Sequence, residues 1–357
     1  MKKTQSKIIV GLSGGVDSAV SAFLLKEQGY DVTGIYMQNW IAEKNDPNCN
    51  AEKDLSDAFA ISKQLNIPFE TVNFSKEYWE YVFQHCLDEL VANRTPNPDI
   101  GCNQYIKFDL FLKHALKLGS NFLATGHYAR CTQDLKLQRA VDLNKDQTYF
   151  LYTLDQEKLS KIIFPIGNLI KPDVRAIAKK AGLLNYDKKD STGICFIGER
   201  KFKEFLQNYI LTRPGEIRSI DGKLLGQHEG LMFYTLGQRQ GLKIGGQKNR
   251  SELPWYVVSK EIKNNILVVA QGENHPALFS SNLICKKINW ISNYPPAENF
   301  NCTAKIRYRQ IDQSCSVVLL ENHSAQVTFD ISQRAITPGQ SIVFYDNDIC
   351  LGGGIII

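Results

Sequence analysis

The amino-acid sequence predicts an α/β protein with a doubly wound parallel sheet, followed by two smaller, mainly β domains. A strand, a glycine loop and a helix open the chain, and helices and strands then alternate at a regular rhythm. After about residue 200 the helical periodicity stops, and glycines, turn pairs and alternating strands take its place. We therefore expect domains at 1–200, 201–278 and 279–357, the last of them a β-barrel.

The first motif follows a short β-branched strand at 7–10 and precedes a helix that we expect to begin near Ser18. Glycines let backbone N–H groups approach a phosphate, and the start of a helix adds unpaired donors and the positive end of its dipole. Ser13 and Ser18 supply hydroxyl donors, and Asp17 is suited to hold a magnesium–pyrophosphate pair. The predicted anion-binding loop reads Gly11-Leu12-Ser13-Gly14-Gly15-Val16-Asp17-Ser18.

The spacing of this loop excludes the two commoner phosphate loops. A Walker loop ends in Gly-Lys-Ser/Thr and a dinucleotide fingerprint has G-x-G-x-x-G spacing, and the loop has neither. The run Ser-Gly-Gly-Val-Asp-Ser resembles the PP-loop of the ATP pyrophosphatases, which adenylylate a carbonyl oxygen and release pyrophosphate. The alternative is a strand–helix turn whose glycines serve only to make it tight.

The composition is that of a globular protein with an uneven charge distribution. A length of 357 residues, with 43% hydrophobic and 22% charged residues, is typical of two or three domains. The formal net charge of +5 is compatible with a polyanionic partner. Ten Lys or Arg but only four Asp or Glu lie in 200–250, so the basic excess is concentrated near mid-chain.

The sequence also indicates the compartment. No secretory signal and no apolar stretch of bilayer-spanning length is present, so we expect a cytoplasmic protein without a membrane partner. Nine cysteines, with no C-x-x-C pair, favour mostly free thiols in a reducing compartment, and we expect no metal centre. Any cysteine chemistry therefore needs thiols that the fold brings together.

The next elements are predicted as a strand at 30–37, a helix at 52–65 and a strand at 68–73. Met37 lies at the carboxyl end of its strand, where open parallel sheets bind ligands. It is either a wall for an adenine ring or a core methionine. A longer helix at 76–94 ends at Thr95-Pro96-Asn97-Pro98, because two prolines break the helix and stiffen an extended turn.

Cys102 follows this turn and precedes a further helix predicted at 105–118. A thiol just before a helix N-terminus has a lowered pKa, which makes its thiolate accessible near neutral pH. Asp99 is close enough in sequence to share the site as a base, an acid or a hydrogen-bond partner. The alternatives are an ordinary buried thiol and a turn cap.

Two later segments carry further candidates. A strand leads to Gly126, which lets a nucleotide approach the backbone, and to His127, a switchable donor or a structural hydrogen-bonder. The glycine-bracketed loop at 190–198 carries Cys195, 93 residues after Cys102. That separation rules out a local motif but allows contact across the top of the sheet. A mobile Cys195 facing a fixed Cys102 would form a redox or sulfur-relay pair.

The β-rich part contains a hairpin predicted at 255–270 and closing strands at 341–357 that suit a barrel. Lys305, Arg307 and Arg309 alternate along one expected strand, so all three should project from one face. Such a face is usually only solvated, but next to the basic mid-chain segment it suits phosphate binding.

Several motifs occur in order along the chain: the glycine loop, Met37 to Trp40, Thr95 to Asn103, Gly126 to Arg130, Lys145 to Gln147, Asp190 to Gly198, Thr235 to Leu242, and Arg307 to Arg309. Over essentially the full length this pattern closely resembles the tRNA-specific 2-thiouridylases. Other PP-loop enzymes share the first motif but not the cysteine pair. Gly101 departs from the bulkier apolar residue of many members, which bears on loop rigidity and not on the chemistry.

The resemblance implies an ATP-dependent tRNA-uridine 2-sulfurtransferase that acts on the wobble uridine of glutamate, lysine and glutamine tRNAs. ATP with its Mg²⁺ would lie against Gly11–Ser18, Met37 and Gly126, and would adenylylate the uracil oxygen. Cys102 matches the nucleophile and Cys195 the persulfide carrier, with a transient disulfide between them.

The resemblance also implies partners and contacts. These are tRNA and a sulfur-donor protein, either a persulfide relay or a cysteine desulfurase, acting on a monomeric enzyme. The residues matched to the tRNA or its target base are Asn97, Pro98, Asp99, His127, Lys145, Asp146, Gln147, Arg307, Tyr308 and Gln340.

Two other functions compete with this interpretation. A PP-loop synthetase acting on a small molecule would need neither Cys102 nor Cys195, nor basic β domains. A non-catalytic tRNA-binding protein would keep the basic domains but tolerate the loss of Asp17 and Cys195.

Overall fold

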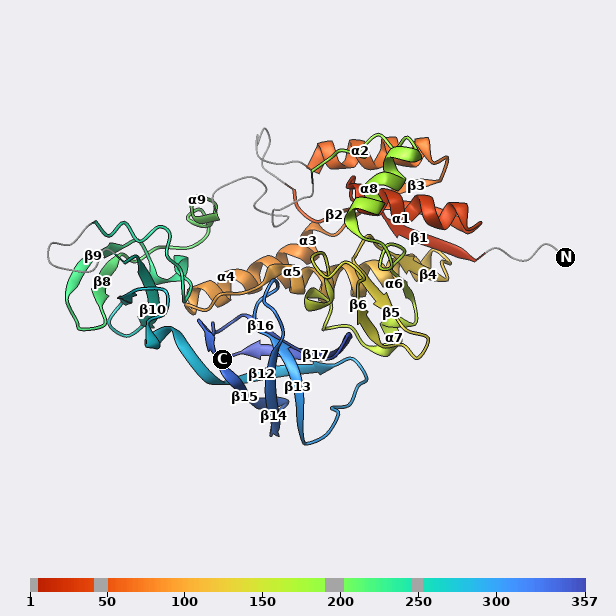
Figure 1. Ribbon diagram of the computed structural model, residues 1–357. Helices are drawn as coiled ribbons and strands as arrows, with labels where there is room; N and C mark the ends of the chain where they lie inside the picture. Colours follow the sequence, from red (N-terminus) through yellow and green to blue (C-terminus); the bar gives the residue numbers. More distant parts are fainter. Residues whose placement is uncertain (1–5, 42–50, 190–201, 246–252) are drawn as a thin grey trace.

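The computed structural model describes residues 6–41, 51–189, 202–245 and 253–357. Figure 1 shows an α/β unit near the N-terminus, a small β unit at the other end of the molecule, and a barrel beneath the helices that lie between them. The first unit contains a parallel sheet and the other two are built of strands, so the predicted fold class is confirmed.

The sheet of the α/β unit is entirely parallel. Its strands are β1 (Lys7–Gly11), β2 (Asp31–Gln38), β3 (Phe69–Asn73), β4 (Phe122–Ala124) and β7 (Ile162–Ile163). They lie in the order β3-β2-β1-β4-β7, so the chain reverses its direction across the sheet between β1 and β4. At such a switch point the connections leave on opposite sides and open a crevice for ligands at the carboxyl ends of the strands.

Side chains of β1 alternate between two hydrophobic cores, one on each face of the sheet. Ile8 and Val10 pack with three helices on one face, whereas Ile9 packs on the other face. The three helices are α1 (Val16–Glu27), α2 (Ala51–Gln64) and α8 (Lys171–Lys180). Because both faces are covered, the strand is apolar along its whole interior, as expected for a parallel sheet.

Two helical runs cover the Ile9 face, and each contains a π-helical segment. The first run consists of α3 (Ser75–Tyr78), η1 (Trp79–Phe83) and α4 (Gln84–Val91). The second consists of α5 (Pro98–Gly101), η2 (Cys102–Phe111) and α6 (Leu112–Lys117). The π-helix closes i→i+5 hydrogen bonds and is frequent at functional sites.

The second run begins earlier than the sequence predicted. Asn97 is its N-cap, and the Asn97 side chain accepts a hydrogen bond from the Asp99 N–H at 3.2 Å. Pro98 occupies the first helical position, where a fixed φ and a missing N–H cost nothing. The prediction that Cys102 precedes a helix was therefore wrong: a full turn separates Cys102 from the N-cap, and the dipole effect falls off within that turn.

The small β unit contains a four-stranded sheet. Its strands are β8 (Gly215–Ser219), β9 (Leu224–His228), β10 (Trp255–Glu261) and β11 (Ile266–Gln271), in the order β10-β11-β8-β9. β10 and β11 are the hairpin predicted at 255–270. The short helix η4 (Leu231–Phe233) belongs to this unit, whereas Phe205 of α9 (Phe202–Leu206) packs against Phe83 in the core of the α/β unit.

The C-terminal strands close into a six-stranded barrel, because β12 pairs with both β15 and β17. The strands are β12 (Phe279–Trp290), β13 (Asn299–Lys305), β14 (Gln313–Leu320), β15 (Ser324–Arg334), β16 (Ser341–Asp346) and β17 (Ile349–Ile356). The expected face of Lys305, Arg307 and Arg309 was wrong. β13 ends at Lys305, and Arg307 begins a turn in which its carbonyl accepts the Gln310 N–H at 3.1 Å.

A hairpin of the α/β unit extends the barrel sheet. Its strands are β5 (Ala129–Cys131) and β6 (Leu137–Arg139), and β6 pairs with β17. The Arg139 guanidinium lies 3.9 Å from the centre of the Tyr345 ring and 2.9 Å from Asp312 Oδ1. Three short helices complete the described part: η3 (Thr148–Phe150), α7 (Gln156–Leu159) and η5 (Pro276–Leu278).

All three parts meet at Thr95, between the two helical runs. The Thr95 N–H donates to the Pro338 carbonyl at 2.9 Å, and Gln340 Nε2 donates to the Thr95 carbonyl at 2.8 Å. The Thr95 hydroxyl lies 3.3 Å from the hydroxyl of Thr235 in the small β unit. We call these four residues the Thr95 joint. It fixes the loop that leads into the helix carrying Cys102.

A half-buried lysine supports the joint from the small β unit. Lys260 Nζ, on β10, donates to the Asn93 carbonyl at 3.0 Å, just beyond the end of α4. Burial lowers the pKa of Lys260 to about 8. A cation at the carboxyl end of a helix is placed favourably with respect to the helix dipole.

Substitution of Gly339 tests whether the close approach of the barrel to Thr95 contributes to stability. Its φ is +90°, and a Cβ there would lie 2.8 Å from the Thr95 nitrogen. Gly222 has a similar φ of +83° but nothing within 4 Å, so Gly222→Ala is a matched control that costs about 1–2 kcal/mol of unfolding free energy. We expect Gly339→Ala to cost more, as measured by urea denaturation. Equal losses would show that the close approach to Thr95 contributes nothing.

Candidate functional site

The glycine loop lies at the switch point of the sheet, where it meets the end of β4. A Cβ on Gly126 would lie 2.8 Å from the Ser18 nitrogen and 2.9 Å from the Asp17 carbonyl carbon. Only glycine therefore lets the segment after β4 pack against the first turn of α1. The sequence associated Gly126 with a close approach, and the group that it approaches in the structure is the loop itself.

The first turn of α1 follows directly on the glycine loop. Gly15 is the N-cap and no side chain caps the helix. Ser18 Oγ accepts the Ser13 N–H at 3.2 Å and donates to the Gly15 carbonyl at 3.0 Å, which holds the turn in shape. The side chains of Leu12 and Val16 are buried in the core, so a ligand can meet these two only through their backbone.

A buried lysine that the sequence analysis missed lies against Asp17. Lys171, at the start of α8, is 8% exposed, and its Nζ lies 2.7 and 2.8 Å from the two Asp17 carboxylate oxygens. The Tyr128 hydroxyl donates to the same carboxylate at 2.8 Å. The loop thus has a lysine, supplied from 154 residues away instead of from a Walker motif.

One sequence signal for Lys171 existed. A cation in the first turn of a helix opposes the helix dipole, so a lysine there requires a specific partner. In this structure the partner is Asp17, and together they place a cation beside the positive end of α1.

A second lysine clamps the loop from the opposite side. Lys188 Nζ contacts Asp54 and Asp57 of α2 at 2.8 and 2.6 Å, and donates to the Gly14 carbonyl at 3.2 Å. Asn185 also donates to the Gly14 carbonyl, at 3.0 Å. Gly14 has a φ of +75°, and a Cβ there would lie 2.5 Å from the Asp54 carbonyl oxygen, so the loop packs tightly on α2.

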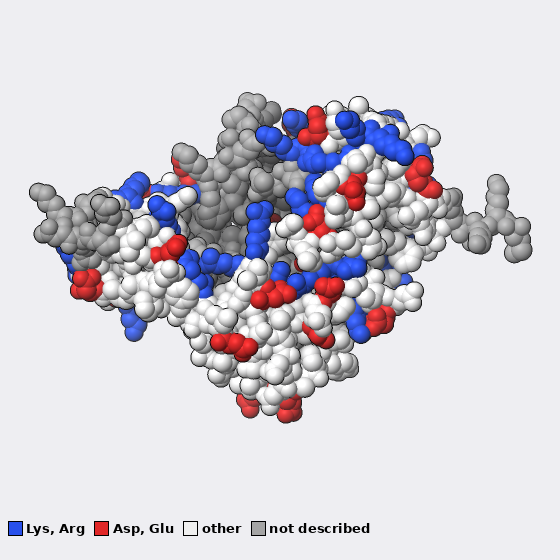
Figure 2. Space-filling view, viewed as in Figure 1, with Lys and Arg blue, Asp and Glu red and all other residues white. Residues whose placement is uncertain are grey.

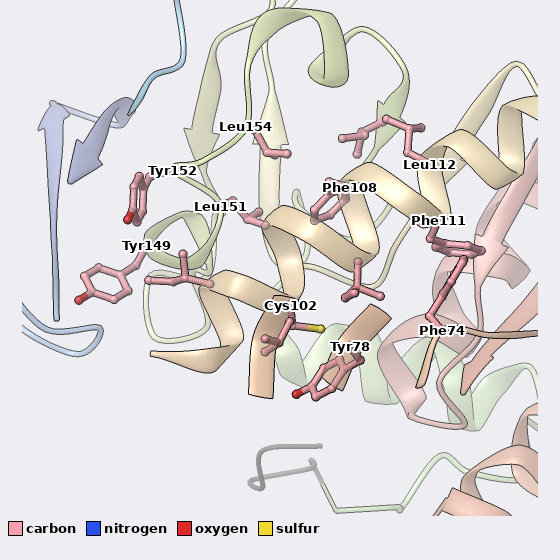
Figure 3. Packing of buried hydrophobic residues seen from close by; sticks show 14 of the residues in the cluster. Phe74, Tyr78, Cys102, Phe108, Phe111, Leu112, Tyr149, Leu151, Tyr152 and Leu154 are labelled. Atoms are coloured by element: carbon pink, nitrogen blue, oxygen red, sulfur yellow. The ribbon is translucent and has the colours of Figure 1, made fainter. Parts of the chain in front are cut away.

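Cys102 lies on the same side of the sheet as Ile9, in the core between the two helical runs. It is 3% exposed, and Figure 3 shows it beside Tyr78 at the start of the helical run that leads to Phe108 and Phe111. Cys195 lies outside the described residues, so the predicted pairing of the two sulfurs stays a prediction.

Asp99 and Met37 border this region. The Asp99 side chain is exposed, but its crowded surroundings raise the pKa of its carboxyl group, an effect that nearby Lys107 opposes. Asp99 therefore keeps a proton to higher pH than an ordinary aspartate does. Met37 is half-buried near the carboxyl end of β2, and its proposed contact with adenine stays a prediction.

Several residues matched to tRNA contacts are engaged within the protein. His127 is 8% exposed, lies 2.8 Å from the Thr125 hydroxyl, and has a pKa well below its ordinary value because it is buried, with a smaller effect from Lys107. Buried Asp146 accepts hydrogen bonds from the Ala140 N–H and the Thr148 hydroxyl.

The other matched residues lie at the contacts between the three parts or beside them. Gln147 accepts the Tyr128 N–H at 2.9 Å, and Lys145 is half-buried. Arg307 donates to the carbonyls of Leu236 and Ala335. Tyr308 packs on Phe150 at 4.4 Å, whereas Gln340 belongs to the Thr95 joint and also donates to the Pro96 carbonyl at 3.3 Å.

Lys and Arg side chains gather around the hollow at the centre of the face in Figure 2. The described residues contain no group of three or more His, Cys, Asp or Glu side chains placed to hold a metal ion. Within the same residues, no helix has the length and apolar character needed to cross a membrane.

Models of known protein families match nearly the whole chain. The one described as the tRNA methyl transferase HUP domain matches residues 6–199, and the tRNA methyl transferase PRC-barrel domain matches 203–271. The aminomethyltransferase beta-barrel domain matches 280–356.

Curated relatives are similar along the full length. The tRNA-specific 2-thiouridylase MnmA of Francisella tularensis subsp. holarctica (strain FTNF002-00 / FTA) is 56% identical over 355 residues, which are 98% of this chain and 99% of that protein. MnmA of F. tularensis subsp. novicida (strain U112) shows the same identity and coverage.

Solved structures are much less similar. NMN synthetase from F. tularensis is 20% identical with a TM-score of 0.36, covering 58% of this chain and 79% of that one. A 4-thiouridine synthetase in complex with RNA and ATP is 16% identical with a TM-score of 0.35, covering 57% and 49%. Similarities of this size carry no argument about the present chain.

The Asp17–Lys171 pair should contribute strongly to stability. Lys171→Met leaves a mostly buried carboxylate without its cation, which costs about 3–5 kcal/mol for a fully buried pair and somewhat less here. The double variant Asp17→Asn/Lys171→Met should regain most of that loss in thermal denaturation. Lys158→Met, which removes a more exposed partner 3.4 Å from Asp155, is the control and should cost under about 1 kcal/mol. Equal losses in the two single variants would contradict the assignment.

His127 should make the fold sensitive to acid. Its folded-state pKa lies below the unfolded value of about 6.5, so the unfolded chain binds more protons and stability falls as pH falls. Each pH unit below about 6.5 should cost up to about 1.4 kcal/mol from this residue, until its folded pKa is reached. Urea denaturation between pH 7 and 5 should show a shallower loss for His127→Gln. An identical pH slope in the variant would rule out this contribution.

Proposed function

The chain belongs to the tRNA-specific 2-thiouridylase family, and from this membership we propose that it is an ATP-dependent tRNA-uridine 2-sulfurtransferase. Its substrate would be the wobble uridine of glutamate, lysine and glutamine tRNAs, whose C2 oxygen it replaces by sulfur. The observation that carries the proposal is the meeting of an anion-binding glycine loop with Gly126 at the switch point, beside a helical run that holds Cys102.

The first step would use the glycine loop. Uracil O2 attacks the α-phosphorus of ATP, and pyrophosphate leaves as the new P–O bond forms. The backbone donors at the start of α1, with Lys171 nearby, would stabilise negative charge on the departing phosphates. Mg²⁺ arriving with ATP would be held by phosphate oxygens and by Asp17, and would neutralise part of the same charge.

The second step would use the cysteines. A persulfide on Cys195 attacks C2 with its terminal sulfur, AMP leaves, and the Cys102 thiolate then displaces the thiolated uracil by forming a disulfide with Cys195. In the other order, Cys102 first attacks the persulfide and releases hydrosulfide, which attacks C2. Both orders end in 2-thiouridine, AMP and a disulfide that a dithiol reductant must reopen.

Asp99 would serve proton transfer beside the target base. The raised pKa of Asp99 favours the protonated form of its carboxyl group, which this transfer would need. Asn97 and Pro98, held by the Thr95 joint, would define the edge of the base pocket. An unpaired anticodon base can be turned into such a pocket at low cost.

We propose that tRNA lies along the basic hollow of Figure 2 and that Lys145–Gln147, Arg307, Tyr308 and Gln340 contact it. The sulfur would come from a persulfide relay protein or a cysteine desulfurase, and the enzyme would act as a monomer in the cytoplasm. Methyl transfer, which the family-model descriptions mention, is less well supported, because relatives at 56% identity over 98% of the chain carry the thiouridylase name.

The cysteine variants test the reaction. With ATP, a glutamate tRNA transcript, cysteine and a cysteine desulfurase, Cys195→Ser should still consume ATP and release pyrophosphate but transfer no sulfur, because activation precedes sulfur attack. Sulfur transfer is measured by the retardation of thiolated RNA in an organomercury gel. Cys285→Ser is the matched control, since burial raises the pKa of Cys285 to about 12 and makes its thiol inert. Normal thiolation by Cys195→Ser would show that another cysteine carries the sulfur.

A further inference from the structure

A groove lies between the two helical runs and the barrel, next to the Thr95 joint. Its volume is about 120 Å³, the space of about four water molecules, which is too small for a drug-sized ligand but suits one flat ring. η1 and η2 supply one wall, β12 the other, and Asn97 and Pro98 stand at one end. None of the residues matched to the nucleotide loop lines it.

Two aromatic side chains make the helical wall suitable for a base. Tyr81 on η1 and Tyr105 on η2 are 44% and 41% exposed, and their ring centres are 6.1 Å apart with the planes tilted by 41°. Large aromatic rings left this exposed are available for stacking, and every nucleobase has a face that stacks on such a ring. Both tyrosines come from π-helical segments, which recur at functional sites.

The floor and the opposite wall carry polar groups. Thr153 is only 8% exposed, lines the groove, and its hydroxyl makes no hydrogen bond to the described residues. Lys287 lies where the register of β12 against β17 is interrupted, and its backbone has a φ of +52°. Such interruptions re-aim a side chain, and here the lysine is part of the groove lining.

The charged groups of the groove suit an anionic chain. Glu89 is the one acidic residue of the lining, and both of its oxygens are engaged by Arg94 at 2.6 Å. Arg94 has the largest effect in lowering the pKa of Glu89, and Lys287 contributes less. A lysine beside aromatic faces is a combination that recognises single-stranded nucleic acid.

We infer that this groove binds a nucleotide of the substrate RNA that neighbours the target uridine. The base stacks on Tyr81 and Tyr105, and its phosphate pairs with Lys287. The inference rests on the proposed function, because Asn97 and Pro98 border both the groove and the expected position of the target base. The groove thereby gives the enzyme a second contact with the anticodon loop, in addition to the pocket for the target base.

The test uses an anticodon stem–loop RNA with 2-aminopurine beside the target uridine. Stacking on a tyrosine quenches this base, so Tyr81→Ala and Tyr105→Ala should reduce the quenching and weaken binding about 5- to 150-fold. Tyr81→Phe should keep the quenching and the affinity of the wild type, because the phenylalanine ring still stacks on the base. Tyr294→Ala removes a tyrosine that is 76% exposed and lies outside the groove, and should leave both unchanged.

The lysine is tested separately through salt dependence. Lys287→Ala should reduce the slope of log affinity against log salt by about 0.7–1, the loss of one phosphate contact. Lys286→Ala removes a neighbouring lysine of the same strand that does not line the groove, and should leave the slope unchanged. Thermal denaturation of each variant identifies any loss of fold.

The outcomes separate this inference from the proposed function. A wild-type enzyme that does not thiolate the full tRNA would overturn the proposed function, and the groove inference with it. A wild-type enzyme that thiolates while the Tyr81, Tyr105 and Lys287 variants bind RNA normally would overturn the groove alone. Variants that bind RNA normally but no longer accept sulfur from the desulfurase would assign the groove to the donor protein instead, which also overturns the inference.

Discussion

The arrangement depends on a few hydrogen bonds around Thr95. This residue pairs with the turn before β16, receives the Gln340 amide, and touches Thr235 of the small β unit. Because Asn97 and Cys102 follow directly on the same chain, the β parts fix the start of the helix that carries the buried thiol. A contact made on the barrel or the small β unit therefore has a short covalent route to the candidate site.

The glycine loop depends on a balance between opposite charges. Asp17 brings negative charge to a loop built for anions, which would be costly without compensation. Lys171 meets that carboxylate from α8, and Lys188 ties the Gly14 carbonyl to two carboxylates of α2. The loop is thus shaped in advance by residues from α2, from α8 and from the segment after α8. Its backbone donors need little reorganisation to meet a phosphate, which is the condition for strong electrostatic stabilisation.

The sequence correctly predicted the elements that interactions between neighbouring residues determine. The β-branched strand, the glycine run and the helical repeat around Gly11–Ser18 were sufficient for the loop, and the 255–270 hairpin was equally clear. The helix start near Cys102 was predicted too late because proline both breaks helices and starts them. Only the Asn97 cap shows that Pro98 starts one here. The role of Lys171 could not be predicted because its partner lies 154 residues away in the sequence. The turn at Arg307 could not be predicted because alternation of side chains does not show where a strand ends.

The shared sheet has a consequence for how the chain is made. β6 ends at Arg139, but its partner β17 begins only at Ile349, 210 residues later. A ribosome releases the chain from the N-terminus, so the hairpin must wait with an unsatisfied edge until almost the entire polypeptide has emerged. Arg139 likewise waits for Tyr345 and Asp312. The edge of β6 is thereby completed only when the last strands of the barrel have been synthesised.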